Sequence, residues 1–465
     1  MGLGLHGGGV ATAKWLSRHG AKVTATDMRS KEILAPSVRA LKGLPVRFAL
    51  GGHVEEDFRT HDLVVANPGV PRESPYLASA RKAGARIEND ASIFFRYSTN
   101  PAIGVTGTRG KTTTTLWIAE LLKKHYPRVR PSGNTPANAL LKEFDRVEGK
   151  GIPVVAELSS WQLEYLPQSE HAPHIAVITN LYPDHLNRYG GSIEAYADAK
   201  AGIFSLQSKG DVLVLNRDNA WWKYFLAKQP KSRVLFTSMK PLPRGVDGMF
   251  VRDGSVVLRL LGKERQMMSL SRFLKERGAH NGGNLLQAML AVFLFDPALV
   301  IKERDILALP TPPMRQEIIL RRGKVVIVND SCATSPDGTI AAIERFSRWG
   351  KVVLIVGGTN KDLEFSGLAR IIKRYVSPEH LILLEGSATT KLCEALSRAR
   401  YSRPAPTPQK TLEACVGAAF FAAKATKGKS VVLFSPGAAS FEKFLHEFDR
   451  GEKFTRIVSR MFKSQ

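Results

Sequence analysis

The sequence predicts an α/β protein with parallel sheets, divided into three domains. Short apolar runs with strand character alternate with helical stretches along the whole chain, which is the pattern of parallel α/β folds. Two stretches rich in turn-forming residues, 97–101 and 310–313, interrupt this alternation and mark joints. We therefore place the domains at residues 1–97, 98–311 and 312–465.

The expected strands fall into three groups that follow these boundaries. They lie at residues 22–27 and 62–66, then at 102–106, 154–158, 175–180 and 212–216, and finally at 325–329, 352–357, 380–385 and 430–435. A helix is expected at 114–125.

Composition narrows the class of protein. The 465 residues are 43% hydrophobic and 23% charged, an ordinary globular mixture, and no apolar run approaches the roughly 20 residues of a membrane span. The three cysteines are far apart and predict neither disulfides nor a zinc site, so a reducing, cytoplasmic setting is expected. The net charge of +25 favours anionic partners, but the basic residues are spread along the chain, which favours a generally solvated surface.

A glycine-rich loop with a lysine follows the expected strand at 102–106. Residues 107–113 read Gly-Thr-Arg-Gly-Lys-Thr-Thr and lead into the expected helix, which is the context of a phosphate loop. Backbone N–H groups would surround the phosphates, Lys111 would reach the terminal phosphates and Thr112 would meet Mg²⁺. The spacing is not that of the strict P-loop, because Val105 stands where a glycine would be needed. The alternative is a glycine turn with an incidental lysine.

The chain opens on a second glycine pattern. Residues 2–7 match G-x-G-x-x-G, and Asp27 closes the next strand, as in a Rossmann-like dinucleotide domain. The strand that should precede the glycines is absent, so either the first strand is missing or the start was assigned late. The alternatives are a dinucleotide site or a tight turn that only packs a helix on a strand.

Three further residues are candidates for metal or acid–base chemistry. Glu157 closes the expected strand at 154–158, where a carboxylate could hold Mg²⁺ or could simply start a helix. His185 follows the strand at 175–180, and by pattern alone it is more typical of a structural histidine. Lys200 lies in a helical stretch and, by pattern alone, is expected to be a solvated surface lysine.

Together these motifs resemble the Mur ligase family. Residues 107–113 are similar to its ATP loop, and residues 157–164, 180–190 and 196–200 to its central-domain signatures. Residues 280–284 resemble its adenine-contacting H-N-x-x-N. In the last third, residues 329–334, 357–361, 435–441 and 449–451 resemble the family members that add D-glutamate. The resemblance covers nearly the whole chain.

The resemblance implies a three-domain ligase. Rossmann-like N-terminal and C-terminal domains would flank a P-loop-type central ATPase domain. ATP, with two Mg²⁺ ions, would drive the addition of D-glutamate to UDP-N-acetylmuramoyl-L-alanine through an acyl phosphate, in the synthesis of peptidoglycan precursors. The first domain would then bind UDP rather than NAD. We expect a monomer with no nucleic-acid partner.

The resemblance also implies roles for residues. The catalytic residues would be Lys111, Glu157, His185 and Lys200, and the metal ligands Thr112, Glu157, His185 and Lys200 as a carbamate. ATP would contact Gly107, Thr108, Arg109, Gly110, Lys111, Thr112, Thr113, Asn281, Asn284, Arg315 and Asp330. The UDP substrate would contact Gly4, Leu5, His6, Gly7, Asp27, Arg29, Asn134 and Ser159, and D-glutamate would contact Thr334, Lys361 and Ser440. By this resemblance Lys200 is not a solvated surface lysine. Reaction with CO₂ would convert its amine into an anionic carbamate, which can bind a metal ion.

Five positions depart from the family pattern. Cys332 replaces a lysine, Met314 a histidine, Arg109 an asparagine, His6 a serine or threonine, and Ala438 a cysteine. The change at Cys332 removes a cation near ATP and D-glutamate. Other hypotheses are a different Mur or folylpolyglutamate-type ligase, a nicotinamide-dependent oxidoreductase based on the first glycines, and a basic P-loop nucleic-acid protein based on the charge.

Overall fold

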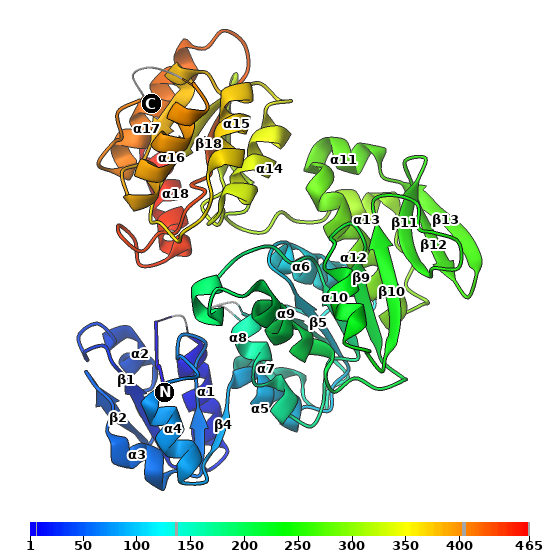
Figure 1. The fold of residues 1–465 in the computed structure, drawn as a ribbon, viewed down its shortest axis with the longest axis vertical. Helices are drawn as coiled ribbons and strands as arrows, with labels where there is room; N and C mark the ends of the chain where they lie inside the picture. Colours follow the sequence, from blue (N-terminus) through cyan, green and yellow to red (C-terminus); the bar gives the residue numbers. More distant parts are fainter. Residues whose placement is uncertain (6, 135–137, 402–405, 464–465) are drawn as a thin grey trace. The chain divides into compact units, whose positions relative to one another are not determined.

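The chain forms two compact units in a computed structural model of residues 1–465. The structure describes all residues except 6, 135–137, 402–405 and 464–465 (Figure 1). The units are Met1–Pro310 and Thr311–Gln465, so the division lies within the joint expected at 310–313. The further boundary at residue 97 stays a prediction. Across the described part of the chain, no helix is both long enough and apolar enough to cross a membrane.

The first part of the first unit contains two pairs of parallel strands. Its elements are α1 (Gly8–Arg18), β1 (Val23–Asp27), α2 (Ala35–Ala40), β2 (Val46–Leu50), α3 (Glu55–Thr60), β3 (Leu63–Val65), α4 (Pro75–Lys82), β4 (Arg86–Glu88) and α5 (Asp90–Tyr97). β1 pairs with β2 and β3 with β4. Residues 1–3 bond to both pairs: Gly2 N donates to Thr26 O at 2.8 Å and Met1 N to Val65 O at 2.9 Å. These residues therefore run where the strand before a glycine turn is expected.

The rest of the first unit is built on a nine-stranded sheet with the order β13-β12-β11-β10-β9-β8-β5-β7-β6. Its strands are β5 (Ala102–Thr106), β6 (Pro131–Gly133), β7 (Val154–Glu157), β8 (Ile175–Ile178), β9 (Val212–Asn216), β10 (Arg233–Ser238), β11 (Gly248–Arg252), β12 (Ser255–Leu260) and β13 (Lys263–Ser269). Its α-helices are α6 (Lys111–Leu122), α7 (Leu140–Val147), α8 (Ser160–Leu163), α9 (Ile193–Ala201), α10 (Trp222–Ala227), α11 (Ser271–Arg277), α12 (Ala279–Phe295) and α13 (Glu303–Leu307). Three short 3₁₀ helices are η1 (Leu166–Gln168), η2 (Leu186–Tyr189) and η3 (Gly202–Phe204).

Apolar side chains cover both faces of this sheet. In β7, Val154 and Ala156 belong to one hydrophobic cluster, which also contains side chains of α7, α9 and α10. Val155, between them, belongs to a second cluster formed with α6 and α12. Successive strand residues point to opposite faces, so burial of both faces requires the continuous apolar runs from which these strands were predicted.

The second unit is a five-stranded sheet with the order β14-β15-β18-β16-β17. Its elements are β14 (Glu317–Arg322), β15 (Val325–Asn329), α14 (Pro336–Phe346), β16 (Lys351–Val356), α15 (Ser366–Tyr375), η4 (Pro378–His380), β17 (Leu381–Leu383), α16 (Ser387–Arg398), α17 (Leu412–Ala425), β18 (Ser430–Phe434) and α18 (Glu447–Lys463). Val352 and Leu354 of β16 pack with α14, α15 and α16. Val353 and Ile355 pack on the other face with α17 and α18.

The sheets are less uniformly parallel than the sequence analysis predicted. Every expected strand is present with its ends displaced by at most two residues, and the helix expected at 114–125 begins three residues earlier, at Lys111. However, β11, β12 and β13 pair antiparallel, as do β14 and β15. The connection between β11 and β12 is Asp253-Gly254, with φ of 49° and 72°, a two-residue turn that can join only antiparallel strands.

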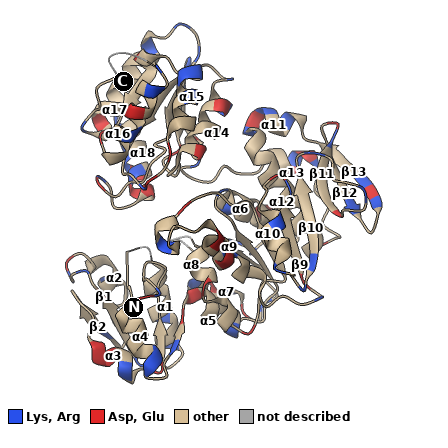
Figure 2. Cartoon of the chain, viewed as in Figure 1, with Lys and Arg blue, Asp and Glu red and all other residues tan. Residues whose placement is uncertain are grey.

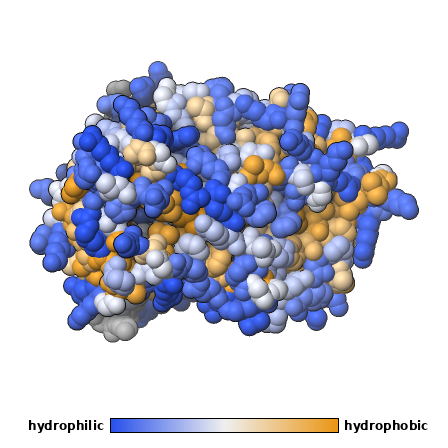
Figure 3. Space-filling view, turned by 90° about the horizontal axis from the view of Figure 1, so that it is seen from below, coloured by the Kyte–Doolittle hydropathy of each residue, from blue (hydrophilic) through white to orange (hydrophobic). Residues whose placement is uncertain are grey.

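The basic residues are dispersed. Lysine and arginine positions are spread along the ribbons of both units and are interspersed with acidic ones (Figure 2). The face drawn in Figure 3 is covered mainly by hydrophilic residues, with smaller apolar areas between them. This distribution favours the interpretation of the +25 charge as a solvated surface rather than a dedicated nucleic-acid face.

Candidate active site

The glycine loop connects β5 to the first turn of α6. Gly107 and Gly110 have φ of 140° and 82°, which L side chains rarely adopt. A Cβ at Gly110 would collide with the amide of Asn284 on α12, so the loop and α12 are in close contact. Because α6 begins at Lys111, its unpaired N–H groups and positive dipole end face the loop. The loop therefore lies between a strand and the start of a helix, as expected, and its use as a phosphate site stays a prediction.

The residues that follow β8 hold this loop in place. Asn180 accepts from Thr108 N through its carbonyl at 2.9 Å and from Arg109 N through its side-chain oxygen at 2.8 Å. The hydroxyl of Thr179 donates to Arg109 O at 2.6 Å. These bonds fix the loop backbone before any ligand binds, which lowers the entropic cost of closing it around phosphates.

The two cations of the loop have different surroundings. The ammonium of Lys111 donates back to the loop carbonyls of Gly107 and Thr108, at 3.0 and 3.3 Å. The guanidinium of Arg109 donates to the buried carboxylate of Asp184 at 2.8 Å. Arg109 is therefore tied to the segment that carries His185. The sequence analysis quoted Asp184 in a motif but assigned it no role.

Lys200 is buried, so the surface position expected from pattern alone is wrong. Its side chain on α9 is 1% exposed, its ammonium donates to Gly107 O at 3.0 Å, and it lies 4.4 Å from the ring centre of Tyr196. Burial, followed by the nearby charge of Lys111, lowers the pKa of Lys200 well below the ordinary value for lysine. Tyr196, Ala197 and Lys200 are the buried residues of α9.

Glu157 and His185 flank the same loop. Glu157 ends β7 and is 3% exposed, and its Oε2 is buried without a hydrogen-bond partner among the described residues. His185 has a left-handed φ of 54° and packs edge-on against Trp161, with ring centres 5.3 Å apart. The charge of Glu157 acts on Lys200, as does that of Asp184. In the described residues, no group of three or more His, Cys, Asp or Glu side chains is arranged to hold a metal by itself.

The carboxyl ends of β6 and β7 bring two predicted substrate residues beside Glu157. Asn134 N donates to Glu157 O at 2.8 Å. Ser159 caps α8, with its hydroxyl accepting from Gln162 N at 3.2 Å. The structure thus places Asn134, Glu157 and Ser159 together, at the edge of the sheet where ligands of α/β proteins bind.

The N-terminal glycine turn is closed by Asp27. One carboxylate oxygen accepts from Gly4 N at 2.9 Å, and the other accepts from Arg29 N and Nε at 3.0 and 3.1 Å. Burial alone raises the pKa of Asp27, but the bonds from Arg29 and Gly4 outweigh it and lower the pKa below its ordinary value. Both carboxylate oxygens of Asp27 therefore hold the glycine turn and the segment at Arg29 in place. Gly7 precedes α1 with φ of 82° and Leu5 is half-buried, whereas His6 lies outside the described residues.

In the second unit, the predicted ligand residues follow neighbouring strands. Thr334 lies beyond β15, Ser440 beyond β18 and Lys361 beyond β16, and these strands are adjacent in the sheet. The hydroxyl of Ser440 is buried without a hydrogen-bond partner among the described residues, so it has bonding capacity left for a ligand. Burial raises the pKa of the Cys332 thiol to about 11, so at neutral pH it provides no charge in place of the family lysine.

Asp330 is the buried acid of the second unit. It accepts from Ser435 Oγ at 2.7 Å and from Gln316 N at 2.9 Å. Burial raises its pKa to about 7, although the bond from Ser435 acts in the opposite direction. Arg315 precedes Gln316 on the same segment, and its charge also acts on Asp330. The two predicted ATP contacts of this unit, Arg315 and Asp330, are therefore close together.

The sequence analysis gave no role to Arg450, although it quoted the motif that contains it. Arg450 is fully buried and donates to Ala438 O and Ala439 O, both at 3.0 Å, and to Ser331 O at 2.7 Å. It therefore joins the loop after β15 to the loop that leads to Ser440. Burial lowers its pKa to about 10, which leaves the guanidinium charged at neutral pH.

Comparisons with known proteins identify the family. The model of the Mur ligase MurD-like N-terminal domain matches residues 1–89, and that of the Mur ligase middle domain matches residues 105–292. A UDP-N-acetylmuramoylalanine–D-glutamate ligase of Roseiflexus sp. (strain RS-1) is 40% identical over 98% of this chain and 97% of its own. The chain belongs to the Mur ligase family. A second ligase of the same name, from Borreliella afzelii, is 34% identical to this Mur ligase over 99% of this chain and 97% of its own.

Solved structures confirm the fold of this Mur ligase. The UDP-N-acetylmuramate–alanine ligase of Thermotoga maritima has a TM-score of 0.61 at 21% identity, covering 100% of this chain and 98% of that one. The MurF ligase of the same organism, solved in complex with ADP, has a TM-score of 0.55 at 18% identity, covering 88% and 99%. The predicted α/β class and family resemblance are thus confirmed. The hypotheses of an oxidoreductase and of a nucleic-acid protein have no support from these relatives.

Proposed function

We propose that this chain is an ATP-dependent ligase that joins D-glutamate to UDP-N-acetylmuramoyl-L-alanine in peptidoglycan precursor synthesis. The observation that carries the proposal is its relation, at 40% identity over nearly the full length of both chains, to a ligase named for that reaction. The glycine loop and its lysine support the use of ATP. The cytoplasmic setting and the monomeric state remain predictions.

The reaction has two steps. An oxygen of the alanyl carboxylate attacks the γ-phosphorus of ATP, the bond to the β-phosphate oxygen breaks, and an acyl phosphate and ADP form. The amine of D-glutamate then attacks the acyl carbon, phosphate leaves, and the amine loses a proton as the amide forms. Both steps build negative charge on oxygens, so they need preorganised positive groups.

The first unit supplies those groups at the glycine loop. The N–H groups of the loop and of the first turn of α6 would bind the phosphates, and Lys111 would exchange its loop carbonyls at 3.0 and 3.3 Å for phosphate oxygens. Arg109, held by Asp184, would add a fixed positive charge beside them. Asn284, in contact with Gly110, would mark the side of the loop on which the nucleoside lies.

The residues around Lys200 fit Mg²⁺. Glu157 offers a buried oxygen that lacks a hydrogen-bond partner among the described residues, and oxygen is the ligand atom that Mg²⁺ prefers. Thr112 and His185 would complete the protein ligands together with a carbamate on Lys200. When bound, Mg²⁺ would withdraw charge from the phosphates during transfer.

Burial prepares Lys200 for this modification. Burial lowers the pKa of Lys200, which favours the neutral amine, and only a neutral amine can attack CO₂. The nitrogen–carbon bond forms, one carbon–oxygen double bond becomes a carboxylate, and the amine releases a proton. The product is an anion, which the nearby positive charge of Lys111 would stabilise.

The remaining assignments follow the family resemblance. Gly4, Leu5, His6 and Gly7 would lie at the substrate diphosphate, Asp27 and Arg29 near the uracil, and Asn134 and Ser159 along the sugar. In the second unit, Arg315 and Asp330 would contact ATP, and Thr334, Lys361 and Ser440 would hold the two carboxylates of D-glutamate.

Phosphate release with substrates omitted in turn tests this function. MgATP with UDP-N-acetylmuramoyl-L-alanine and D-glutamate should release phosphate at a rate far above any mixture that lacks one of the three. Phosphate release that depends instead on a different UDP-muramoyl substrate, or on a folate, would assign the chain to another branch of the superfamily.

A further inference from the structure

Three loops of the second unit meet at one edge of its sheet. They follow β18, β16 and β17, which are adjacent and parallel, so their carboxyl ends lie side by side. The first loop carries Ser440 and the second carries Lys361. Thr359 and Ala439 exchange backbone hydrogen bonds of 2.9 and 3.1 Å, which join these two loops directly.

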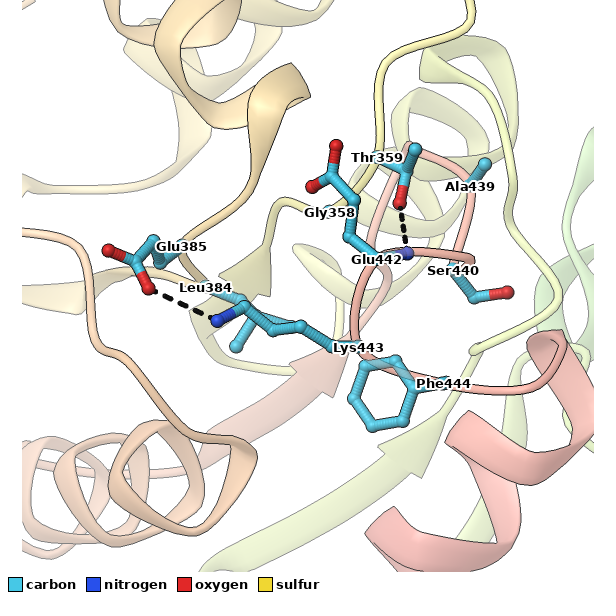
Figure 4. A pocket seen from close by; sticks show the side chains of 9 residues that line it. All are labelled: Gly358, Thr359, Leu384, Glu385, Ala439, Ser440, Glu442, Lys443 and Phe444. Atoms are coloured by element: carbon cyan, nitrogen blue, oxygen red, sulfur yellow. Dashed lines mark hydrogen bonds and ion pairs between the residues drawn. The ribbon is translucent and has the colours of Figure 1, made fainter.

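Glu442 connects all three loops. Its backbone N–H donates to the hydroxyl of Thr359 at 3.0 Å (Figure 4). Its carboxylate accepts from Ser387 N at 3.0 Å and also from the Ser387 hydroxyl, at the start of α16. The Ser387 hydroxyl in turn accepts from Asn360 N at 2.8 Å. The bonds form a closed ring through residues 359–360, 387 and 442.

This ring lies between the two residues assigned to the D-glutamate carboxylates. Lys361 follows Asn360 in the sequence, and Ser440 precedes Glu442 by two residues. In Figure 4 the hydroxyl of Ser440 points away from the Lys443–Glu385 ion pair. An unengaged carboxylate this close to an anionic substrate would repel it. The N-terminus of α16 and the two bonds from Ser387 stabilise the negative charge of Glu442 in place.

We propose that Glu442 is a positioning residue for D-glutamate, whose carboxylate sets the separation of Lys361 and Ser440 by tying their loops to the start of α16. It does not touch the substrate. It acts by holding two loops, each of which carries one ligand group, at a fixed spacing. This inference rests on the proposed function. It assigns the rigidity of the amino-acid site to the bonds that join Glu442 to residues 359–360 and 387.

Steady-state kinetics of three variants in the full chain test the proposal. Glu442→Ala removes the carboxylate, and Glu442→Gln keeps its shape but weakens the bonds to Ser387. We expect the KM for D-glutamate to rise about tenfold in Glu442→Ala and less in Glu442→Gln, because a bond to a charged group is lost or weakened. Glu442→Asp should recover most of the wild-type KM. The KM for ATP and the melting temperature should change little.

Glu385→Gln is the matched control. Glu385 is a nearby carboxylate that pairs with Lys443 at 3.1 Å. Its substitution should leave the KM for D-glutamate unchanged. The proposal is overturned if Glu442→Ala and Glu442→Gln keep the wild-type KM for D-glutamate, or if the KM for ATP rises equally. Failure of the wild-type chain to use D-glutamate would instead refute the proposed function.

Discussion

Removal of the buried guanidinium of Arg450 should lower the free energy of unfolding of the second unit by several kcal/mol. Arg450 makes three hydrogen bonds to carbonyls, of 2.7 to 3.0 Å, and is fully buried. At about 1.5–3 kcal/mol for each bond to a charged group, the sum reaches roughly 5–9 kcal/mol. Such bonds are not additive, so we expect Arg450→Ala to cost about 3–5 kcal/mol, as for a broken buried polar network.

Hydrogen exchange in the full chain can measure this loss in the second unit alone. Amides of β15 and β18 should exchange roughly 10²- to 10⁴-fold faster in Arg450→Ala, because each 1.4 kcal/mol corresponds to a factor of about ten. Arg456→Ala is the control, since Arg456 is exposed on the same helix, and it should change exchange by less than about threefold. Equal exchange in the two variants would refute the structural role of Arg450.

Three further outcomes are expected. Lys200→Ala should lose at least about 10²-fold in kcat, because its metal ligand is gone, and high formate should restore part of it; full activity without formate would remove Lys200 from the site. Lys361→Ala should raise the KM for D-glutamate by about 10- to 100-fold and leave that for ATP within twofold, and equal changes in both KM values would contradict its assignment. The pKa of Asp330 is raised from an unfolded value near 3.8 to about 7, so its protonated form stabilises the folded state. That stability is full below about pH 4 and is lost as pH rises towards 7, by up to about 4 kcal/mol. Asp330→Asn should flatten this dependence in urea titrations between pH 5 and 7, and an unchanged slope would show that Asp330 is not its source.

The parts of the fold that were predictable share one physical feature. Parallel strands covered on both faces need apolar residues throughout, so runs such as that of β16 (Lys351–Val356) stand out in the sequence. The glycine loop was equally visible, because glycines suit left-handed backbone such as that of Gly110 and stand between a strand and a helix in the sequence. Both signals are local, and neither depends on distant parts of the chain.

The antiparallel hairpins were not predicted from the hydrophobic pattern of the sequence. β13 (Lys263–Ser269) is mostly exposed at the edge of the sheet and carries charged residues, so it gives no apolar run. The turn at Asp253-Gly254 was nevertheless a recognisable hairpin signal and would have indicated β11 and β12. The antiparallel strands were therefore partly predictable from turn chemistry rather than from hydrophobicity.

Some site residues could be placed from local sequence, and others depend on contacts between distant parts of the chain. Lys111 and Glu157 follow strands, and their positions could be inferred from sequence. Lys200 could not, because its burial depends on contact between α9 and the loop at Gly107, residues far apart in the chain. A lysine on a helix is usually solvated, and only the tertiary structure or the family resemblance reverses that expectation.

The central claim is the choice of amino acid, and a competition experiment tests it most directly. Equal concentrations of D-glutamate and L-glutamate, one of them isotopically labelled, would be supplied with MgATP and UDP-N-acetylmuramoyl-L-alanine, and the product would be analysed by mass. We predict that nearly all of the amide product contains D-glutamate. A product that carries mainly L-glutamate, or no amide product while ATP is consumed, would contradict it.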